Sequence, residues 1–470
     1  MRSTNKSIGN RNSKVLSPAW LLCGLAIIFA TLLLSIDVHA KVANADSSDV
    51  KYVRIGVSAS FSGSRRSPSL NGLYGMLAMV DWINNDDNPG FKIGKKRLKF
   101  NLEIYDDSSS NDNVEQIYSS LAKGSNKVDF LIGPYSSSAT QVAAEISEER
   151  KILLVAPFGA SDSLYENPSG WRVQVCPPAS RYYKELVAML SEKASTLGIT
   201  LNTALAFETD IFSTSVHDAT KELVDADTNF NTFFDSSYPS EGGDLLTVGG
   251  DMDTFVNELL VSIELNNSDS DSIVIIGGGH DTDGIAFAQL LDSKEYTPAA
   301  LALLIAPGIP TFFCDVAQAD AGCTESYAEG VTTSVFTWLP TLEIFKENIT
   351  NVSDGLNWVG PSHDEALELI KSKYGDIEPS YQAGSGGQAI LALAKAMENA
   401  QSTKKKKVRN AIKKLKFQSC FGNYGVDKDT GIQELQDMLV VQWQVISDEP
   451  ELHVVWPQST ATNDFVFPMP

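Results

Sequence analysis

Positive charge is scarce in this sequence. Its 470 residues include 37 lysines and arginines against 59 aspartates and glutamates, a formal net charge of −22 at pH 7. Nucleic-acid binding needs a basic face that neutralises phosphates, so this balance argues against a nucleic-acid partner. The lysine-rich runs 404–407 and 413–416 flank apolar residues at helical spacing, and we interpret them as a solvated helix face.

Histidine is also rare, with five in the whole chain, and so is cysteine, again with five. There is no Cys-x-x-Cys pair, and the His-Asp pairs at 280–281 and 363–364 lack the further ligands that a metal site needs. The Gly-x-Ser-x-Gly turn of many serine hydrolases is absent. The sequence therefore predicts no metal, no cofactor and no enzymatic activity.

Long apolar runs are confined to the N-terminus. Residues 1–19 carry four basic side chains, Trp20–Ser35 is apolar and uncharged, and the segment 38–40 has the small residues of a cleavage site. This order predicts a signal peptide over 1–40, a linker over 41–51, and a secreted or periplasmic protein. An uncleaved membrane anchor through residues 20–35 is the alternative, because the basic leader is long.

Export implies an oxidising compartment, in which cysteines pair. Four cysteines follow the leader. Cys314 and Cys323 bracket a short loop that contains Asp, Ala and Gly, and we predict a disulfide between them. Cys176 and Cys420 remain, and the sequence leaves their pairing open.

Strands and helices alternate from Tyr52 onward, which predicts an α/β protein with parallel sheets and crossover helices. The pattern is broken at Pro177-Pro178 and then restarts, which indicates two lobes. The stretch 235–252, rich in Ser, Gly and Asp, is expected to be a loop with a short strand. Strands are expected at 53–57, 98–105, 128–132, 152–156, 171–176, 204–207, 272–276, 300–305, 330–336 and 437–446.

Two polar turns at strand ends predict a binding crevice. The strand 128–132 runs through Gly133-Pro134 into the serines 136–138, which open the helix Ala139–Arg150. A helix start has unpaired N–H groups and partial positive charge, and therefore favours an anion such as a carboxylate. The turn 157–162 follows the next strand, and neighbouring strand ends of an open α/β sheet form the usual ligand crevice.

The order of these pieces resembles the type I periplasmic solute-binding proteins of the leucine/isoleucine/valine-binding kind, whose module also forms the ligand-binding lobes of several extracellular receptors. The resemblance implies two doubly wound parallel-sheet lobes joined by a three-crossing hinge. Lobe 1 would hold 52–175 and 331–415, lobe 2 would hold 176–330 and 416–458, and 459–470 would be a C-terminal tail. The matching pieces are Ile55-Gly56-Val57, Phe61-Ser62-Gly63, Tyr105-Asp106-Asp107, Ile132-Gly133-Pro134, Ser136–Thr140, Val155-Ala156-Pro157, Val440–Trp443 and Val454–Pro457.

The resemblance also implies where a ligand binds and what it is. It suggests an amino acid or related carboxylate held between the lobes for transport or sensing, with a membrane permease or a receptor as partner. The implied ligand-binding residues are Ser136, Ser137, Ser138, Phe158, Ala160, Ser161, His280 and Asp281. Among them, Ser137 and the N–H groups of Ser136–Ser138 and Ala160 would hold the carboxylate.

The sequence departs from the family pattern at two positions. Ala160 stands where many members have a threonine, and no acidic residue follows the strand 300–305. Ser161 or Asp162 would then replace the missing hydroxyl, and Asp281 or Asp283 would bind an ammonium group. The aromatic residues Tyr135, Phe158, Phe212 and Trp338 are each better interpreted as core than as ligand contacts. The other functions considered are a cell-surface sensory or adhesion module and a secreted enzyme on the same fold.

Overall fold

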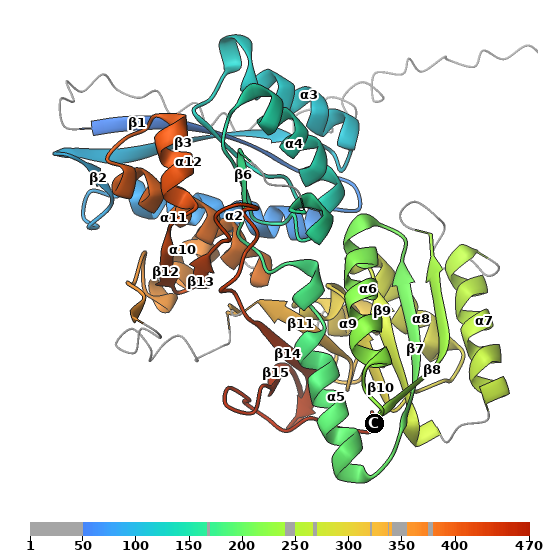
Figure 1. The fold of residues 1–470 in the computed structure, drawn as a ribbon. Coiled ribbons are helices and arrows are strands. Elements are labelled where there is room, and N and C mark those ends of the chain that lie inside the picture. Colours follow the sequence, from blue (N-terminus) through green and yellow to red (C-terminus); the bar gives the residue numbers. More distant parts are fainter. Residues whose placement is uncertain are drawn as a thin grey trace, which may run out of the picture. The chain divides into compact units, whose positions relative to one another are not determined.

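Two sheets, each built mainly from parallel strands, organise the chain (Figure 1). The computed structural model describes residues 50–166, 170–239, 250–266, 270–319, 322–336, 338–340, 355–374 and 379–470. The predicted signal or anchor segment 1–40 and nearly all of the linker 41–51 lie outside the described residues. In the described part of the chain, no helix is both long and apolar enough to cross a membrane.

The first sheet has the strand order β2-β3-β1-β4-β5-β6. Every neighbouring pair is parallel except β2 with β3. In β4, Phe130 and Ile132 belong to one apolar core and Leu131 to another, because successive strand residues point to opposite faces. The strands are β1 (Val50–Ala59), β2 (Lys92–Ile93), β3 (Lys96–Asp106), β4 (Phe130–Ile132), β5 (Leu154–Ala156) and β6 (Arg172–Gln174).

Helices cover both faces of this sheet (Figure 1). On the Ile132 face lie α2 (Arg66–Asn84), α10 (His363–Tyr374), α11 (Tyr381–Ala400) and α12 (Lys405–Ile412), and on the Leu131 face lie α3 (Asn111–Ala122) and α4 (Ser137–Arg150). Glycines let α2 and α11 touch, since a Cβ on Gly386 would lie 2.1 Å from the backbone oxygen of Gly72. This contact fixes α11, whose first residues line the site.

The second sheet has the order β15-β14-β11-β10-β9-β7-β8. The strands from β8 to β11 are parallel, whereas β14 and β15 are antiparallel additions. The strands are β7 (Leu201–Glu208), β8 (Phe230–Tyr238), β9 (Ile273–Gly278), β10 (Ala300–Leu303), β11 (Thr332–Phe336), β14 (Met438–Ile446) and β15 (Glu449–Trp456).

Helices again cover both faces. One apolar core contains Leu205 together with α5 (Lys184–Leu197) and α6 (Ile211–Asp225). The other contains Ala206 together with α7 (Asp251–Asn266), α8 (Asp281–Ser293) and α9 (Phe312–Val316). Both sheets therefore have the doubly wound arrangement that the sequence predicts.

Three crossings join the lobes: after β6, after β11, and before β14. Two lobe boundaries differ from those expected. β11 pairs with β10, so the second lobe continues through Phe336 instead of ending at residue 330. The hairpin β12 (Lys416–Ser419) and β13 (Gly422–Gly425) packs in the first core, although 416–458 was assigned to the second lobe. The residues of a short strand do not by themselves show which sheet the strand joins.

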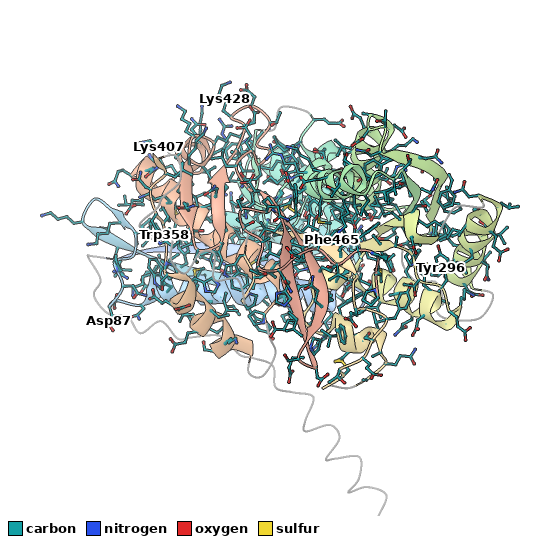
Figure 2. All side chains as sticks on the ribbon, turned by 90° about the horizontal axis from the view of Figure 1, so that it is seen from below. Asp87, Tyr296, Trp358, Lys407, Lys428 and Phe465 are labelled. Carbon is teal, nitrogen blue, oxygen red and sulfur yellow. A yellow bond between two sulfur atoms is a disulfide. The ribbon has the colours of Figure 1, made fainter. Side chains whose placement is uncertain are left out.

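Two segments have more structure than the sequence predicts. The expected loop 235–252 overlaps the end of β8, and α7 begins within it. The C-terminal tail 459–470 binds to the second lobe: Val466 N–H donates to Gln442 Oε1 (2.9 Å), and Met469 N–H donates to the Ala299 carbonyl (2.9 Å). Phe465, labelled in Figure 2, packs against the second core.

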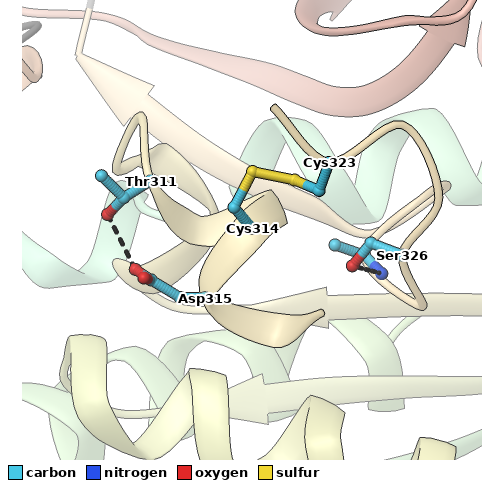
Figure 3. Close-up of a disulfide and its surroundings, with 6 residues drawn as sticks. Thr311, Cys314, Asp315, Cys323 and Ser326 are labelled. Atoms are coloured by element: carbon cyan, nitrogen blue, oxygen red, sulfur yellow. Dashed lines mark hydrogen bonds between the residues drawn. A yellow bond between two sulfur atoms is a disulfide. The ribbon is translucent and has the colours of Figure 1, made fainter. Parts of the chain in front are cut away.

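The predicted disulfide between Cys314 and Cys323 is present, with the two Cα atoms 5.6 Å apart (Figure 3). Cys314 lies on α9, beside a hydrogen bond from Thr311 Oγ1 to Asp315 Oδ2 of 2.7 Å. Cys176 and Cys420 are free, buried thiols, so the pairing that the sequence leaves open does not occur. Burial raises the pKa of both thiols, which keeps them protonated and unreactive at neutral pH.

Candidate ligand-binding site

A cavity lies where the carboxyl ends of strands from both sheets meet. It has about 350 Å³ of empty space, part of it open to solvent. The lining residues are Tyr135, Ser136, Ser137, Phe158, Ala160, Tyr182, Phe212, His280, Ile305, Phe336, Tyr381 and Gln382.

The first polar wall of the cavity is the N-terminus of α4. Ser136 is the N-cap, and its Oγ accepts a hydrogen bond from Ala139 N–H (3.2 Å). Among the described residues, no hydrogen-bond acceptor contacts the N–H groups of Ser137 and Ser138. These unpaired donors and the helix dipole make this corner electropositive.

The second turn, residues 157–162, does not offer the hydrogen-bond donor that the sequence analysis expected. Ala160 lines the cavity, but its N–H donates to the Phe158 carbonyl (3.0 Å) and is not available to a ligand. Ser137 Oγ accepts from Ser161 N–H (3.0 Å), so this serine joins the two turns. The Ser137 oxygen is therefore occupied as an acceptor, while its hydroxyl proton remains a donor.

Aromatic rings form most of the cavity wall. Adjacent rings contact one another in sequence from the first lobe to the second and back, with centroid separations between 4.8 and 6.4 Å. In that sequence the rings are Phe158, Tyr135, His280, Phe212, Tyr182, Phe336 and Tyr381. Gly72 makes room for the first of them, since a Cβ there would lie 2.0 Å from Phe158 Cζ. The wall suits a flat or branched apolar group.

The start of α11 adds two hydrogen-bonding groups without partners. The Tyr381 hydroxyl and Gln382 Nε2 are buried and make no hydrogen bond in the described part of the protein. Gln382 is held in place because its Oε1 accepts from Ser380 Oγ. Buried polar groups are normally paired, so these two atoms are candidates for hydrogen bonds to a ligand oxygen.

Backbone strain occurs on both sides of the cavity. Ser136 has φ 79° and ψ 155°, a region populated almost only by glycine. Ile305, two residues after the end of β10, has φ 56° and ψ −62°, and Ala306 N–H donates to the Leu304 carbonyl (2.6 Å). This is a γ-turn with positive φ, which is rare and strained, and especially so for a β-branched residue. Residues held in such conformations cluster at ligand sites.

A buried group of charged residues lies next to the cavity on the second lobe. His280 Nδ1 is 2.8 Å from Glu208 Oε2, and His280 Nε2 is 4.0 Å from Asp210 Oδ2. Glu208 ends β7 and His280 follows the adjacent strand β9, in which Gly278 pairs with Phe207. One atom from each of the three residues lies within 4.8 Å of the other two, so the group has the dimensions of a cation site.

The pKa values in this group reflect close pairing inside the protein. Burial acts to lower the pKa of His280, but the hydrogen bond and charge of Glu208 raise it to about 10. Burial acts to raise the pKa of Glu208, but its contacts with His280 lower it. Burial and the neighbouring Glu208 charge raise the pKa of Asp283. Burial also raises the pKa of Asp281, to about 6. Carboxylates therefore outnumber the single imidazole here.

Five of the eight residues predicted for the site line the cavity: Ser136, Ser137, Phe158, Ala160 and His280. The other three do not. Ser138 Oγ lies 3.1 Å from Ser136 Oγ, Ser161 Oγ contacts Ser215 Oγ (2.7 Å), and Asp281 is buried with Oδ1 unpartnered. Tyr135 and Phe212 line the cavity although core packing was the preferred interpretation for each.

Five lining residues were not considered from the sequence: Tyr182, Ile305, Phe336, Tyr381 and Gln382. Phe336 is the last residue of β11, and Tyr381 is the first residue of α11. Only the absence of an acidic residue after β10 drew attention to the region of Ile305. The other four carry no local signal that separates them from ordinary core residues.

Comparison with known proteins gives a family match over part of the chain. Residues 52–229 match the family described as periplasmic binding protein. These residues include the serine turn at 136–138 and the segment 157–162, together with Glu208 and Asp210. The sequence-based resemblance to type I periplasmic binding proteins is therefore confirmed.

Solved structures give the fold of the rest. An ABC transporter substrate-binding protein from Sphaerobacter thermophilus matches with TM-score 0.65 and 15% identity, covering 88% of this chain and 99% of that chain. The substrate-binding protein LivJ from Streptococcus pneumoniae, solved with isoleucine, matches with TM-score 0.63 and 16% identity over 87% of this chain and 100% of that one. A Rhodopseudomonas palustris solute-binding protein, solved with 4-hydroxybenzoate, matches with TM-score 0.61 and 15% identity over 88% and 98%. The two-lobe fold expected from the sequence is confirmed.

Proposed function

We propose that this chain, a type I periplasmic binding protein by its fold and by the family match of residues 52–229, binds a small carboxylate with an aromatic or branched apolar body. The ligand class includes aromatic carboxylates and apolar amino acids. The observation that carries the proposal is the cavity wall, in which aromatic rings surround a few unpaired hydrogen-bond donors.

The carboxylate lies at the N-terminus of α4 in this proposal. The N–H groups of Ser137 and Ser138 and the Ser137 hydroxyl proton are the donors at that corner. A carboxylate there gains charge-assisted hydrogen bonds and a favourable interaction with the helix dipole. The Ala160 N–H, which the sequence suggested, is left out because it already donates to Phe158.

The body of the ligand lies between the aromatic rings, with an oxygen at the start of α11. The Tyr381 hydroxyl and Gln382 Nε2 would be satisfied by such an oxygen, for example a ring hydroxyl. The related structures solved with isoleucine and with 4-hydroxybenzoate make both kinds of body reasonable probes.

The direct test is a binding screen by calorimetry and thermal shift with benzoate, 4-hydroxybenzoate, phenylalanine, tyrosine and isoleucine. Benzamide serves as the uncharged partner of benzoate. We expect at least one carboxylate to bind and to raise the melting temperature by mass action, and benzamide to bind far more weakly. Equal binding of benzoate and benzamide, or no binding by any carboxylate in the panel, would reject the proposal.

A pair of matched variants tests the position of the ligand. Tyr381→Phe removes a buried hydroxyl that has no partner, so it leaves the stability of the free protein nearly unchanged. It is expected to weaken the binding of a hydroxyl-bearing ligand such as 4-hydroxybenzoate by about 2- to 10-fold, which is the effect of losing one neutral hydrogen bond. Tyr424→Phe is the control, because Tyr424 is also buried with an unpartnered hydroxyl but does not line the cavity. Equal effects of the two variants would contradict this placement.

The wider role proposed is that of a non-enzymatic, extracytoplasmic binding protein that delivers its ligand to a membrane permease. The family match supports it, as does the similarity in fold to ABC transporter substrate-binding proteins. The predicted signal over residues 1–40 supports export. N-terminal sequencing of the exported protein tests this point, and a start near Lys41 is expected. An intact leader would favour the anchored sensory module instead.

A further inference from the structure

We infer that His280 and Asp210 bind a transition-metal divalent cation such as Zn²⁺ beside the solute cavity, with Glu208 as the hydrogen-bond partner that orients His280. One ligand atom from each residue lies within 4.8 Å of the others, and all three side chains are largely buried. The inference does not depend on the identity of the solute, because it concerns the metal alone.

The scaffold brings these residues together from two adjacent parallel strands. Glu208 ends β7 and His280 begins the turn into α8 after β9, so their strand ends lie at the same sheet edge. Gly279 permits this approach, since a Cβ there would lie 2.1 Å from Glu208 Oε2. Asp210 caps α6 through Oδ1, which accepts from Ser213 N–H (2.6 Å), and this leaves Oδ2 directed toward His280.

The geometry around the imidazole fits a metal ligand. Metal-bound histidines usually donate their second ring N–H to a carboxylate, and His280 Nδ1 lies 2.8 Å from Glu208 Oε2. His280 Nε2 and Asp210 Oδ2 are 4.0 Å apart, too far for a hydrogen bond. Two ligands on a tetrahedral Zn²⁺ are about 3.4 Å apart, so a small side-chain movement places both on one ion.

Further support comes from a buried oxygen atom without a partner. Glu208 Oε1 is buried and accepts no hydrogen bond among the described residues. Asp283 is paired with Glu208 through a side-chain hydrogen bond, and burial and the Glu208 charge raise the pKa of Asp283 to about 8. Glu208 is 1% exposed and Asp283 is 3% exposed, and a Cβ on Gly279 would lie within 2.8 Å of both carboxylates. A buried carboxylate with an unpartnered oxygen is stabilised by positive charge nearby, and a metal ion on His280 and Asp210 would add such charge.

The ligand types select the class of metal. Imidazole with carboxylates suits Zn²⁺ and other first-row divalent ions, whereas Ca²⁺ and Mg²⁺ prefer oxygen ligands alone. His280 also lines the solute cavity, so a metal bound to it would lie at the edge of the cavity. An ammonium group of an organic ligand, which is also positively charged, is the competing occupant.

The test uses the full chain, stripped of metal with EDTA and titrated with Zn²⁺ in a calorimeter, with Ca²⁺ and methylammonium in parallel. We expect one Zn²⁺ per chain, and much weaker binding of the other two. Glu208→Gln and Asp210→Asn keep the side-chain shapes, and Asn remains a good helix cap. Each is expected to weaken Zn²⁺ binding by about 10-fold or more.

The matched control is Asp235→Asn. Asp235 also contacts a histidine, His217 (2.8 Å), but that imidazole is already bonded on both nitrogens and Lys221 neutralises the acid. This variant should leave Zn²⁺ binding unchanged. Zinc-edge X-ray absorption on the wild-type protein, which does not depend on any variant folding, should report a single imidazole among oxygen ligands. The inference is overturned by absent Zn²⁺ binding, by sulfur or two imidazoles in that spectrum, by insensitivity to both variants, or by methylammonium binding as tightly as Zn²⁺.

Discussion

The γ-turn at Ile305 leads to an unusual expectation, namely that glycine at this position destabilises the protein less than alanine does. Replacing Ile305 by Gly or by Ala removes the same buried side chain, so the packing loss is nearly common to both variants. They differ in the backbone, because only glycine adopts φ 56° without strain. Strain of this kind costs about 1–3 kcal/mol. The extra freedom of glycine in the unfolded chain costs about 0.4–1 kcal/mol in return.

The balance favours glycine by about 1 kcal/mol, since the strain exceeds the entropy loss. Ile305→Gly is therefore expected to be more stable than Ile305→Ala. Both variants are less stable than the wild type, because Ile305 is 6% exposed within the second core. In urea unfolding the two midpoints should differ by about 0.3–1 M, given the usual dependence of stability on denaturant.

Leu303 supplies the control for this comparison. It is fully buried in β10, two residues before the turn, and is not among the residues with positive φ. At such a position glycine is less stable than alanine by about 0.5–1 kcal/mol, so the order of the Leu303 variants is reversed. If Ile305→Ala proved as stable as Ile305→Gly, the strained turn would be excluded.

Three further predictions concern neighbouring features. Ser137→Ala should lower the free energy of unfolding by about 1–3 kcal/mol, because the buried Ser161 N–H loses its acceptor, whereas Ser138→Ala should have little effect in the same urea experiment. Cys176 and Cys420 should not react with a thiol reagent in the native protein, because burial raises the pKa of both, and both should react in denaturant. Burial acts to raise the pKa of Asp235, but His217 and Lys221 lower it. The stabilisation by Asp235 is therefore present above its unfolded pKa of about 4 and is lost as the pH falls through the lower folded value, so wild type and Asp235→Asn should converge in stability at acid pH.

The sequence predicts the fold well because the signals are local and repeated. Strand-length apolar runs followed by helices recur through both halves, and the strand-end turns mark the sheet edge. The assignment of single strands to a sheet was less successful. β11 and the β12-β13 hairpin pair or pack according to contacts with distant segments, which the residues themselves do not encode.

The sequence predicted the site only where turn residues join the end of a strand to the start of a helix. The serine turn combines a strand end, a Gly-Pro pair and a helix start, and two of its serines do line the cavity. Tyr182, Phe336 and Tyr381 resemble core residues in every local respect. They become a ligand wall only because three crossings bring segments from both halves of the chain to one place.

The family resemblance implies an acidic residue after the strand that ends at Leu303, and this chain instead has Ile305 in a strained turn. The acidic groups of the second lobe lie at the ends of β7 and β9, where Glu208, Asp210 and Asp283 surround His280. In this chain the acidic groups therefore lie at the neighbouring strand ends and not after β10. The apolar side chain of Ile305 extends the aromatic wall of the cavity. Glu208, Asp210 and Asp283 are not among the residues that line the cavity, whereas His280 is. A ligand ammonium group in the cavity consequently meets the imidazole before it meets any of these acids. Within the proposed ligand class we therefore expect carboxylates without an ammonium group to bind more tightly than α-amino acids, in the same calorimetric screen.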